Sequence, residues 1–251
     1  MIRIQGIEKR YGDFQALKPL DLHVRKGEVF GFLGPNGAGK TTLIRMIAGV
    51  LPPTAGSIMI NGIDLSKDPL RAKWNTGYIP DRPYLYEKLT ARELLEFIGG
   101  IYGLETPEIE RRGEALLKRY ELWEVSNQLV EGFSHGMKQR LTFCASLLHE
   151  PALVIVDEPM VGLDPRGARQ IKDVFRQIAE QGRTVFLSTH SLDVAQEVCD
   201  RLVILNHGEI VAQGSYSEIR STAHPNARDL EEVFLCILEE ESELKASKGA
   251  E

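Results

Sequence analysis

The chain has 251 residues, a length between the usual sizes of one domain and of two, so we expect one domain with an inserted lobe. Hydrophobic residues make up 43% and charged residues 26%, which excludes a disordered or fibrous chain. The net charge of -6 argues against a nucleic-acid-binding protein, because such proteins usually carry a basic surface. No apolar run reaches the roughly 18 residues that cross a bilayer, and the first residues predict no secretory signal.

The first quarter of the chain predicts strands around one helix. Residues 2–7 and 20–24 alternate apolar and polar side chains, as half-buried strands do. Residues 29–33 are continuously apolar and end at glycines, which is typical of a strand buried on both faces of a parallel sheet. Helical spacing follows over residues 42–48, and residues 56–62 predict another strand.

The middle of the chain predicts helices only. Thr90 and Glu93 form a capping box ahead of an apolar helical run, a second helix opens at Pro107, and residues 139–148 predict a third. We therefore expect a helical subdomain over residues 88–148 that interrupts a core formed by residues 1–87 and 149–220.

Strand patterns return in the last third. Residues 153–156 and 184–188 predict two buried strands, and residues 202–205 and 209–212 predict a hairpin. A C-terminal extension over residues 221–251 is expected to hold an acidic amphipathic helix at 229–244 and a frayed tail from Lys245. The resulting fold class is α/β with a mostly parallel sheet.

A glycine-rich loop lies between a buried strand and a helix. It matches the G-x-x-x-x-G-K-[ST] motif in full and is called the phosphate loop below: Gly34, Pro35, Asn36, Gly37, Ala38, Gly39, Lys40 and Thr41, followed by Thr42. Glycines let the backbone N–H groups wrap phosphates, and the start of the next helix adds a positive dipole end. Lys40 is expected to reach the β- and γ-phosphates of a nucleotide, and the Thr41 hydroxyl to bind Mg²⁺.

Two acidic residues end the predicted strand at 153–156. In this position Asp157 is expected to hold Mg²⁺ and Glu158 to polarise an attacking water. A pair of acids could also be a plain polar strand end, but the phosphate loop upstream favours the catalytic interpretation.

The order of these motifs resembles the nucleotide-binding subunit of ABC transporters over nearly the whole chain. Three further segments carry the resemblance. Ser134, His135, Gly136 and Met137 resemble the ABC signature, usually Ser-Gly-Gly-Gln, with departures at His135 and Met137. Asp164 matches the D-loop, and His190 matches the switch histidine.

The resemblance implies a P-loop NTPase (RecA-like) core with an N-terminal antiparallel β subdomain and an inserted α-helical subdomain. It also implies roles for single residues. Tyr11 would stack on adenine, and His190 would contact the γ-phosphate and hold the attacking water together with Glu158. Ser134 would bind the ATP of a partner subunit, so that two ATP molecules lie between the halves of a head-to-tail dimer.

One position departs from the family pattern. The family carries a glutamine in the loop that joins the core to the helical subdomain, whereas this chain has Asp81. An aspartate there could bind Mg²⁺, directly or through water. The segment 81–90, together with Glu231-Glu232-Val233-Phe234, resembles the ATPase subunits of ABC-2-type exporters.

The resemblance predicts an ATPase subunit that powers a transporter, with ATP and Mg²⁺ as ligands. We expect integral membrane permease subunits and a second copy of the chain, or a homologous ATPase, as partners, and a peripheral location on the cytoplasmic face of the membrane. A soluble ABC ATPase of translation or DNA repair is the alternative. It fits less well, because translation-type members usually carry two cassettes and repair-type members insert long coiled coils. A kinase or GTPase would not explain the signature, Asp164 and His190 together.

Overall fold

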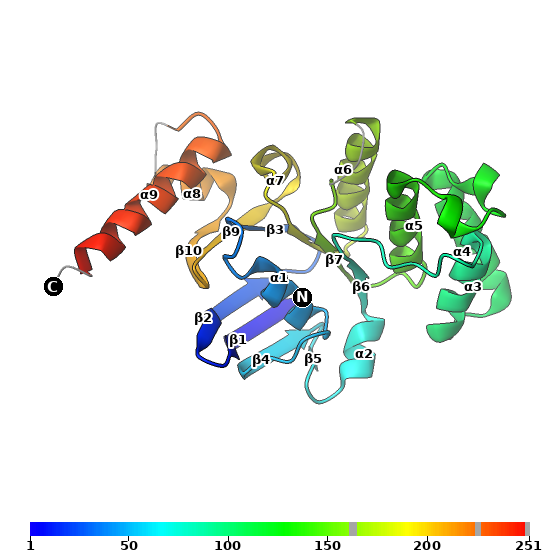
Figure 1. Ribbon diagram of the computed structural model, residues 1–251, viewed down its shortest axis with the longest axis horizontal. Helices are drawn as coiled ribbons and strands as arrows, with labels where there is room; N and C mark the ends of the chain where they lie inside the picture. Colours follow the sequence, from blue (N-terminus) through cyan, green and yellow to red (C-terminus); the bar gives the residue numbers. More distant parts are fainter. Residues whose placement is uncertain (161–164, 224–226, 249–251) are drawn as a thin grey trace.

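The computed structural model of the chain describes residues 1–160, 165–223 and 227–248. Figure 1 shows two β-sheets at the centre, a group of helices formed by the middle of the chain on one side, and the C-terminal helix projecting on the other. Within the described residues, no helix is long and apolar enough to span a membrane.

The smaller sheet comes from the first quarter of the chain and is antiparallel. Its four strands lie in the order β2-β1-β4-β5 and span Phe14–Val24, Ile2–Tyr11, Ala55–Ile60 and Ile63–Asp64. The alternating pattern expected for 20–24 is present, because every second side chain points into the space between the two sheets. Over 2–7 the buried side chains are Ile2, Ile4 and Ile7, because a register shift after Ile4 interrupts the alternation.

The larger sheet has the strand order β10-β9-β3-β8-β7-β6. In chain order these strands are β3 (Val29–Leu33), β6 (Thr76–Ile79), β7 (Leu153–Asp157), β8 (Thr184–Ser188), β9 (Arg201–Asn206) and β10 (Glu209–Gly214). All neighbours pair in parallel except β9 and β10, which form the expected antiparallel hairpin. Because parallel strands end at the same edge, the residues that follow β3, β6, β7 and β8 gather there.

Both faces of the larger sheet are covered. Alternate side chains such as Phe30 and Phe186 face α1 (Lys40–Ile47) and the smaller sheet, and these residues form one apolar cluster. The intervening residues, such as Val185, face α6 (Pro165–Glu180), which lies on the opposite side in Figure 1. The largely apolar sequences of β3, β7 and β8 follow from this two-sided burial.

The helical lobe consists of α3 (Ala91–Ile101), α4 (Thr106–Arg119) and α5 (His135–Leu147), with short 3-10 turns at Trp123–Val125 and Val130–Gly132. The capping box at the start of α3 is confirmed, with Thr90 and Glu93 bonded in both directions. The third helix begins four residues earlier than the predicted start at 139, because the Ser134 side chain caps it.

The remaining helices surround the larger sheet and its last hairpin. They are α2 (Pro69–Trp74), α7 (Leu192–Val198), α8 (Tyr216–Ala223) and α9 (Leu230–Lys248). Helix α9 continues to Lys248, past the residue Lys245 at which the sequence predicts that a frayed tail begins. The predicted division at residue 220 falls inside α8.

Candidate active site

The phosphate loop leaves β3 at Leu33 and enters α1 at Lys40, as the motif predicts. Gly39 caps the helix with φ 106°, in the left-handed region. A Cβ on Gly39 would lie 2.8 Å from the Ala16 carbonyl oxygen, and one on Gly34 would lie 2.3 Å from the Leu205 carbonyl oxygen. The antiparallel sheet and β9 therefore press against the loop closely enough to require glycine at both positions.

The Lys40 side chain lies inside the loop that precedes it. Its Nζ donates to the carbonyl oxygens of Gly34 at 2.5 Å and Pro35 at 3.0 Å, and the residue is 8% exposed. Burial lowers the pKa of the Lys40 ammonium, while the nearby carboxylates of Glu158 and Asp157 act in the opposite direction. A buried cation therefore faces the two acids across the edge of the sheet.

The other loop residues leave room for a ligand. Asn36, Gly37 and Thr41 are exposed, and Thr42 is half-buried. The Ala38 carbonyl oxygen accepts a bond from the Gly208 amide at 3.0 Å, which ties the loop to the β9–β10 turn. The loop is therefore anchored to the β9–β10 turn, while its residues Asn36, Gly37 and Thr41 stay exposed.

Asp157 is the last residue of β7 and is 3% exposed. Burial raises the pKa of its carboxyl to about 6, and the negative charges of Asp81 and Glu158 act in the same direction. Asp81 follows β6, the strand beside β7, and is exposed. The position expected to hold the family's glutamine therefore lies close enough to Asp157 to influence its charge.

Glu158 and His190 are in direct contact. His190 Nδ1 lies 2.8 Å from Glu158 Oε2, and the His190 amide also donates to that oxygen at 3.3 Å. Glu158 has φ 48°, a left-handed conformation that a non-glycine residue adopts at a cost of roughly 1–3 kcal/mol. Its amide donates to the Ser188 carbonyl oxygen at 2.9 Å, so β8 holds the backbone that carries the carboxylate.

The signature residues lie in the helical lobe. Ser134 is the exposed N-cap of α5, and its Oγ accepts a bond from the Met137 amide at 3.3 Å. His135 is exposed and Gly136 is half-buried in the first turn of α5. Figure 1 shows α5 well apart from α1, so the signature and the phosphate loop of one chain do not form one site.

The roles expected for Tyr11 and Asp164 stay predictions. Tyr11 is the last residue of β1 and is 49% exposed, with Lys9 Nζ 5.2 Å from its ring centroid. The stacking of Tyr11 on adenine stays a prediction. Asp164 lies outside the described residues.

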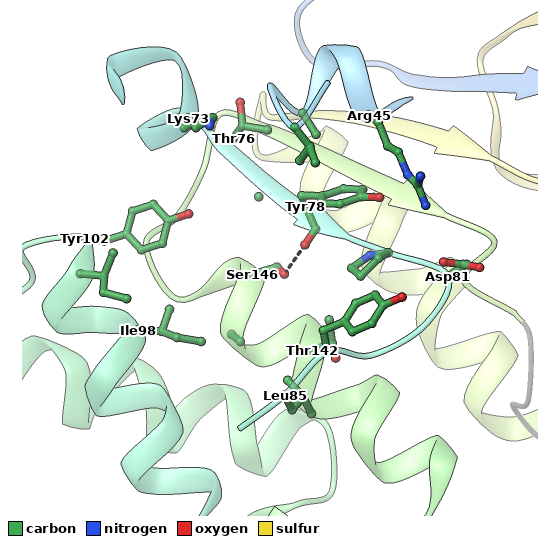
Figure 2. Close-up of a pocket in the computed structure, with 17 residues that line it drawn as sticks. Arg45, Lys73, Thr76, Tyr78, Asp81, Leu85, Ile98, Tyr102, Thr142 and Ser146 are labelled. Carbon is green, nitrogen blue, oxygen red and sulfur yellow. Dashed lines mark hydrogen bonds between the residues drawn. The ribbon is translucent and has the colours of Figure 1, made fainter. Parts of the chain in front are cut away.

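A cleft that no sequence pattern predicts lies between the core and the helical lobe. Figure 2 shows this cavity of about 650 Å³, whose walls include Arg45 of α1, Tyr78 of β6 and Tyr102 after α3. Ser146 Oγ of α5 donates to the Tyr78 carbonyl oxygen at 2.9 Å. Tyr102 stacks on His149 with ring centroids 3.7 Å apart, which joins the lobe to the core.

The rim of the cleft is apolar and open to solvent, with Tyr84 81% and Ile101 60% exposed. Only exposure distinguishes such residues from core residues, and a sequence does not report exposure. The single sequence signal was the closeness of Tyr84 to Asp81 in the chain.

Comparison with known proteins decides the family. The model of the ABC transporter family matches residues 17–161. The chain belongs to the ABC transporter family. The linearmycin resistance ATP-binding protein LnrL of Bacillus subtilis is 39% identical over 221 residues, which cover 88% of this chain and 71% of LnrL.

Solved structures agree with this assignment. The ATP-binding subunit of an ABC transporter superposes with a TM-score of 0.90 at 34% identity, covering 95% of this chain and 99% of that one. A dimeric cassette in a post-hydrolysis state with ADP and Pi superposes with a TM-score of 0.78 at 27% identity, covering 86% and 98%. The P-loop NTPase fold is confirmed, and the chain is an ATP-binding, ATP-hydrolysing subunit of a transporter.

As an ABC ATPase subunit, the chain dimerises and works with membrane permease partners. The translation or DNA-repair alternative has no support among these comparisons.

Proposed function

We propose that this chain hydrolyses Mg²⁺-ATP on the cytoplasmic face of a membrane and drives export through an ABC-2-type permease. The observation that carries the proposal is the contact between Glu158 and His190, 2.8 Å apart, at the sheet edge where the phosphate loop also lies. This contact places a general base, Glu158, and the switch histidine, His190, next to the expected position of the γ-phosphate of a bound nucleotide.

The phosphate loop holds the nucleotide in this proposal. Its amides and the N-terminus of α1 bind the phosphates, and Lys40 leaves the carbonyl oxygens of Gly34 and Pro35 to reach the β- and γ-phosphates. Tyr11 stacks on the adenine ring. The Tyr11 side chain is already exposed, and Lys40 lies inside the loop that carries the exposed residues Asn36 and Gly37.

The residues beside Lys40 fit a magnesium ion. Mg²⁺ prefers oxygen ligands and is bound by one or two protein groups together with substrate phosphates. Asp157 carries a raised pKa because it is buried beside the carboxylates of Asp81 and Glu158, and a cation offsets that repulsion. Thr41 and Asp157 would hold the ion, with Asp81 a further oxygen donor. When bound, Mg²⁺ neutralises negative charge on the phosphates.

No group of three His, Cys, Asp or Glu side chains in the part of the chain that the structure describes could hold a metal by itself.

Glu158 and His190 act on the attacking water. The Glu158 carboxylate accepts a hydrogen bond from the water and orients it in line with the γ-phosphate. His190 donates a hydrogen bond to a γ-phosphate oxygen and keeps the carboxylate in place. The backbone bond from the His190 amide to Glu158 supports this alignment independently of the imidazole.

The signature serves the ATP of a second copy. Ser134 and the first amides of α5 form an anion-binding helix start that lies apart from the chain's own phosphate loop. A head-to-tail dimer with twofold symmetry places each signature over the other subunit's nucleotide. Asp164 is proposed to contact the partner at the same interface.

The cleft between core and lobe is the proposed docking site for the permease. Its exposed Tyr84 and Ile101 suit an apolar cytoplasmic segment, and Arg45 and Asp81 offer charged partners at one end. The negative charge of Asp81 also raises the pKa of the Asp157 carboxyl. A permease segment that binds in the cleft beside Asp81 therefore changes the electrostatics of the hydrolysis site. Export is supported by the name of LnrL, a resistance protein, and by the Asp81 segment.

Two experiments test the proposal. Gel filtration of Glu158→Gln with Mg²⁺-ATP is expected to yield a dimer, and adding Ser134→Ala is expected to abolish it while ATP binding by the monomer stays unchanged. A monomer that hydrolyses ATP at the full rate would overturn the shared-site model.

The second experiment maps the permease. A photo-crosslinker attached at Ile101→Cys, at the rim of the cleft, should capture one integral membrane protein from native membranes. The same reagent at Gln5→Cys, on the antiparallel sheet, should not. Transport by the captured permease in inside-out vesicles, with uptake into the lumen, then checks the export direction, and uptake by right-side-out vesicles would contradict it.

A further inference from the structure

The short helix α7 begins at Leu192, two residues after His190, and so anchors the segment that holds His190. Its N-cap, Ser191, makes no side-chain capping bond, and the helix is only seven residues long. A helix this short is not stable by itself, so packing against its neighbours decides where it lies. The position of His190 therefore depends on what α7 packs against.

Two consecutive residues of α7 reach opposite neighbours. Glu197 pairs with Lys172 and Arg176 of α6 at 2.5 and 3.2 Å. Gln196 Oε1 accepts a hydrogen bond from the Leu230 amide in the first turn of α9 at 2.8 Å. The C-terminal helix therefore holds α7 from the side that α6 does not.

The contact between α9 and the core is apolar as well as polar. Leu230 and Val233 of α9 are fully buried in a cluster with Ala195 of α7 and Leu33 of β3. Leu33 directly precedes the phosphate loop, and Ala195 directly precedes Gln196. One face of α9 thus supports the elements that carry the phosphate loop and the switch histidine. Figure 1 shows α9 running outward from this contact.

We propose that α9 positions His190 through α7, with Gln196 as the positioning residue. The inference rests on the proposed role of His190 in hydrolysis. Gln196 touches neither nucleotide nor water; its bond to α9 holds the last turn of α7 and, through this seven-residue helix, the distance between the imidazole and Glu158. Displacing α9, by a permease or by the second subunit, would then lower turnover without loosening the nucleotide.

The first test is steady-state kinetics of the full chain. Gln196→Met keeps the length of the side chain but removes the acceptor, and it is expected to lower kcat about three- to tenfold with the KM for ATP unchanged. Gln196→Glu retains an acceptor oxygen and should restore turnover. Gln5→Met, an exposed glutamine on β1, is the matched control and should leave kcat unchanged. An unchanged kcat in Gln196→Met would overturn the proposal.

A double-mutant cycle separates positioning from general stability. In a His190→Ala background, Gln196→Met should cause no further loss, because the residue acts through the imidazole. An equal loss in both backgrounds would show that α9 acts elsewhere and would overturn the inference. If His190→Ala leaves turnover intact, the proposed role of His190 has failed.

The imidazole NMR signals of His190 then test the mechanical link without turnover. They should shift in Gln196→Met but not in Gln5→Met, and an unshifted signal would overturn the link. If Gln196→Met does not fold, Gln196→Asn, which withdraws the acceptor by one methylene, replaces it in all three measurements.

Discussion

His190 Nδ1 lies 2.8 Å from Glu158 Oε2, although the two residues are 32 positions apart in the chain. Glu158 directly follows β7 and His190 follows β8, and these strands pair in parallel with Asp157 opposite Ser188. The left-handed backbone at Glu158 turns its carboxylate toward the histidine, and its side chain is 19% exposed against 66% for His190. Glu158 is therefore a largely buried carboxylate in contact with the accessible side chain of His190.

Glu158→Gln is expected to abolish hydrolysis while nucleotide binding is retained. The amide is nearly the same size but is a much weaker base, and loss of a general base typically lowers the rate by about 10²–10⁴-fold. Phosphate release and nucleotide titration measure the two properties separately. Glu124→Gln, an exposed residue in the helical lobe, should hydrolyse normally. Wild-type turnover in Glu158→Gln would assign the catalytic carboxylate elsewhere.

Lys40→Ala is expected to weaken ATP binding by at least about tenfold, because a charge-assisted bond to phosphate contributes roughly 1.5–3 kcal/mol. Without nucleotide, the variant also loses the two bonds from Nζ to the carbonyl oxygens of Gly34 and Pro35. The shift of the unfolding temperature on adding Mg²⁺-ATP measures binding. The exposed Lys26→Ala is the control and should keep the full shift. An undiminished shift in Lys40→Ala contradicts the assignment.

Asp157→Asn is expected to stabilise the nucleotide-free protein near neutral pH. The folded carboxyl has a pKa of about 6, and the unfolded one has a pKa of about 3.9. The folded state therefore binds more protons in between, and wild-type stability falls as the pH rises from about 4 to about 6. The full shift corresponds to about 3 kcal/mol, which is the upper limit of the expected gain.

Urea unfolding in chelator at pH 4 and pH 7 measures this difference. Asp157→Asn should gain stability over wild type at pH 7 and lose that gain near pH 4. The exposed Asp13→Asn should unfold as the wild type does at both pH values. Equal stability of Asp157→Asn and wild type at pH 7 would mean that the carboxyl is not strained by burial.

Two glycines of the phosphate loop offer a matched pair. Gly39→Ala brings a Cβ within 2.8 Å of the Ala16 carbonyl oxygen at φ 106°, whereas Gly37→Ala at φ 81° meets nothing within 4 Å. Backbone strain alone costs about 1 kcal/mol in Gly37→Ala, and the added clash brings Gly39→Ala to about 3 kcal/mol. Chemical denaturation without nucleotide compares them. Equal losses would show that the antiparallel sheet does not constrain the loop.

The sequence determined the parts of this protein that are local. The phosphate loop is contiguous, so its residues could be found and ordered without a structure, and the capping box of α3 is a four-residue signal. The largely apolar stretches predicted β3, β7 and β8, because burial on both faces favours apolar residues. Helix α6 carries a local signal as well, because its buried residues Ile171, Val174, Phe175 and Ile178 repeat at helical spacing.

Only the tertiary structure decided which local signals meet. The contact between Glu158 and His190, the influence of Asp81 on Asp157 and the bond between Gln196 and α9 each join segments that only the packing of the sheet brings together. The exposure of Tyr84 and the cleft beside it also arise from the way the helical lobe sits on the core. Short motifs encode their own backbone conformation, whereas a contact between distant residues depends on strand order, which no single segment specifies.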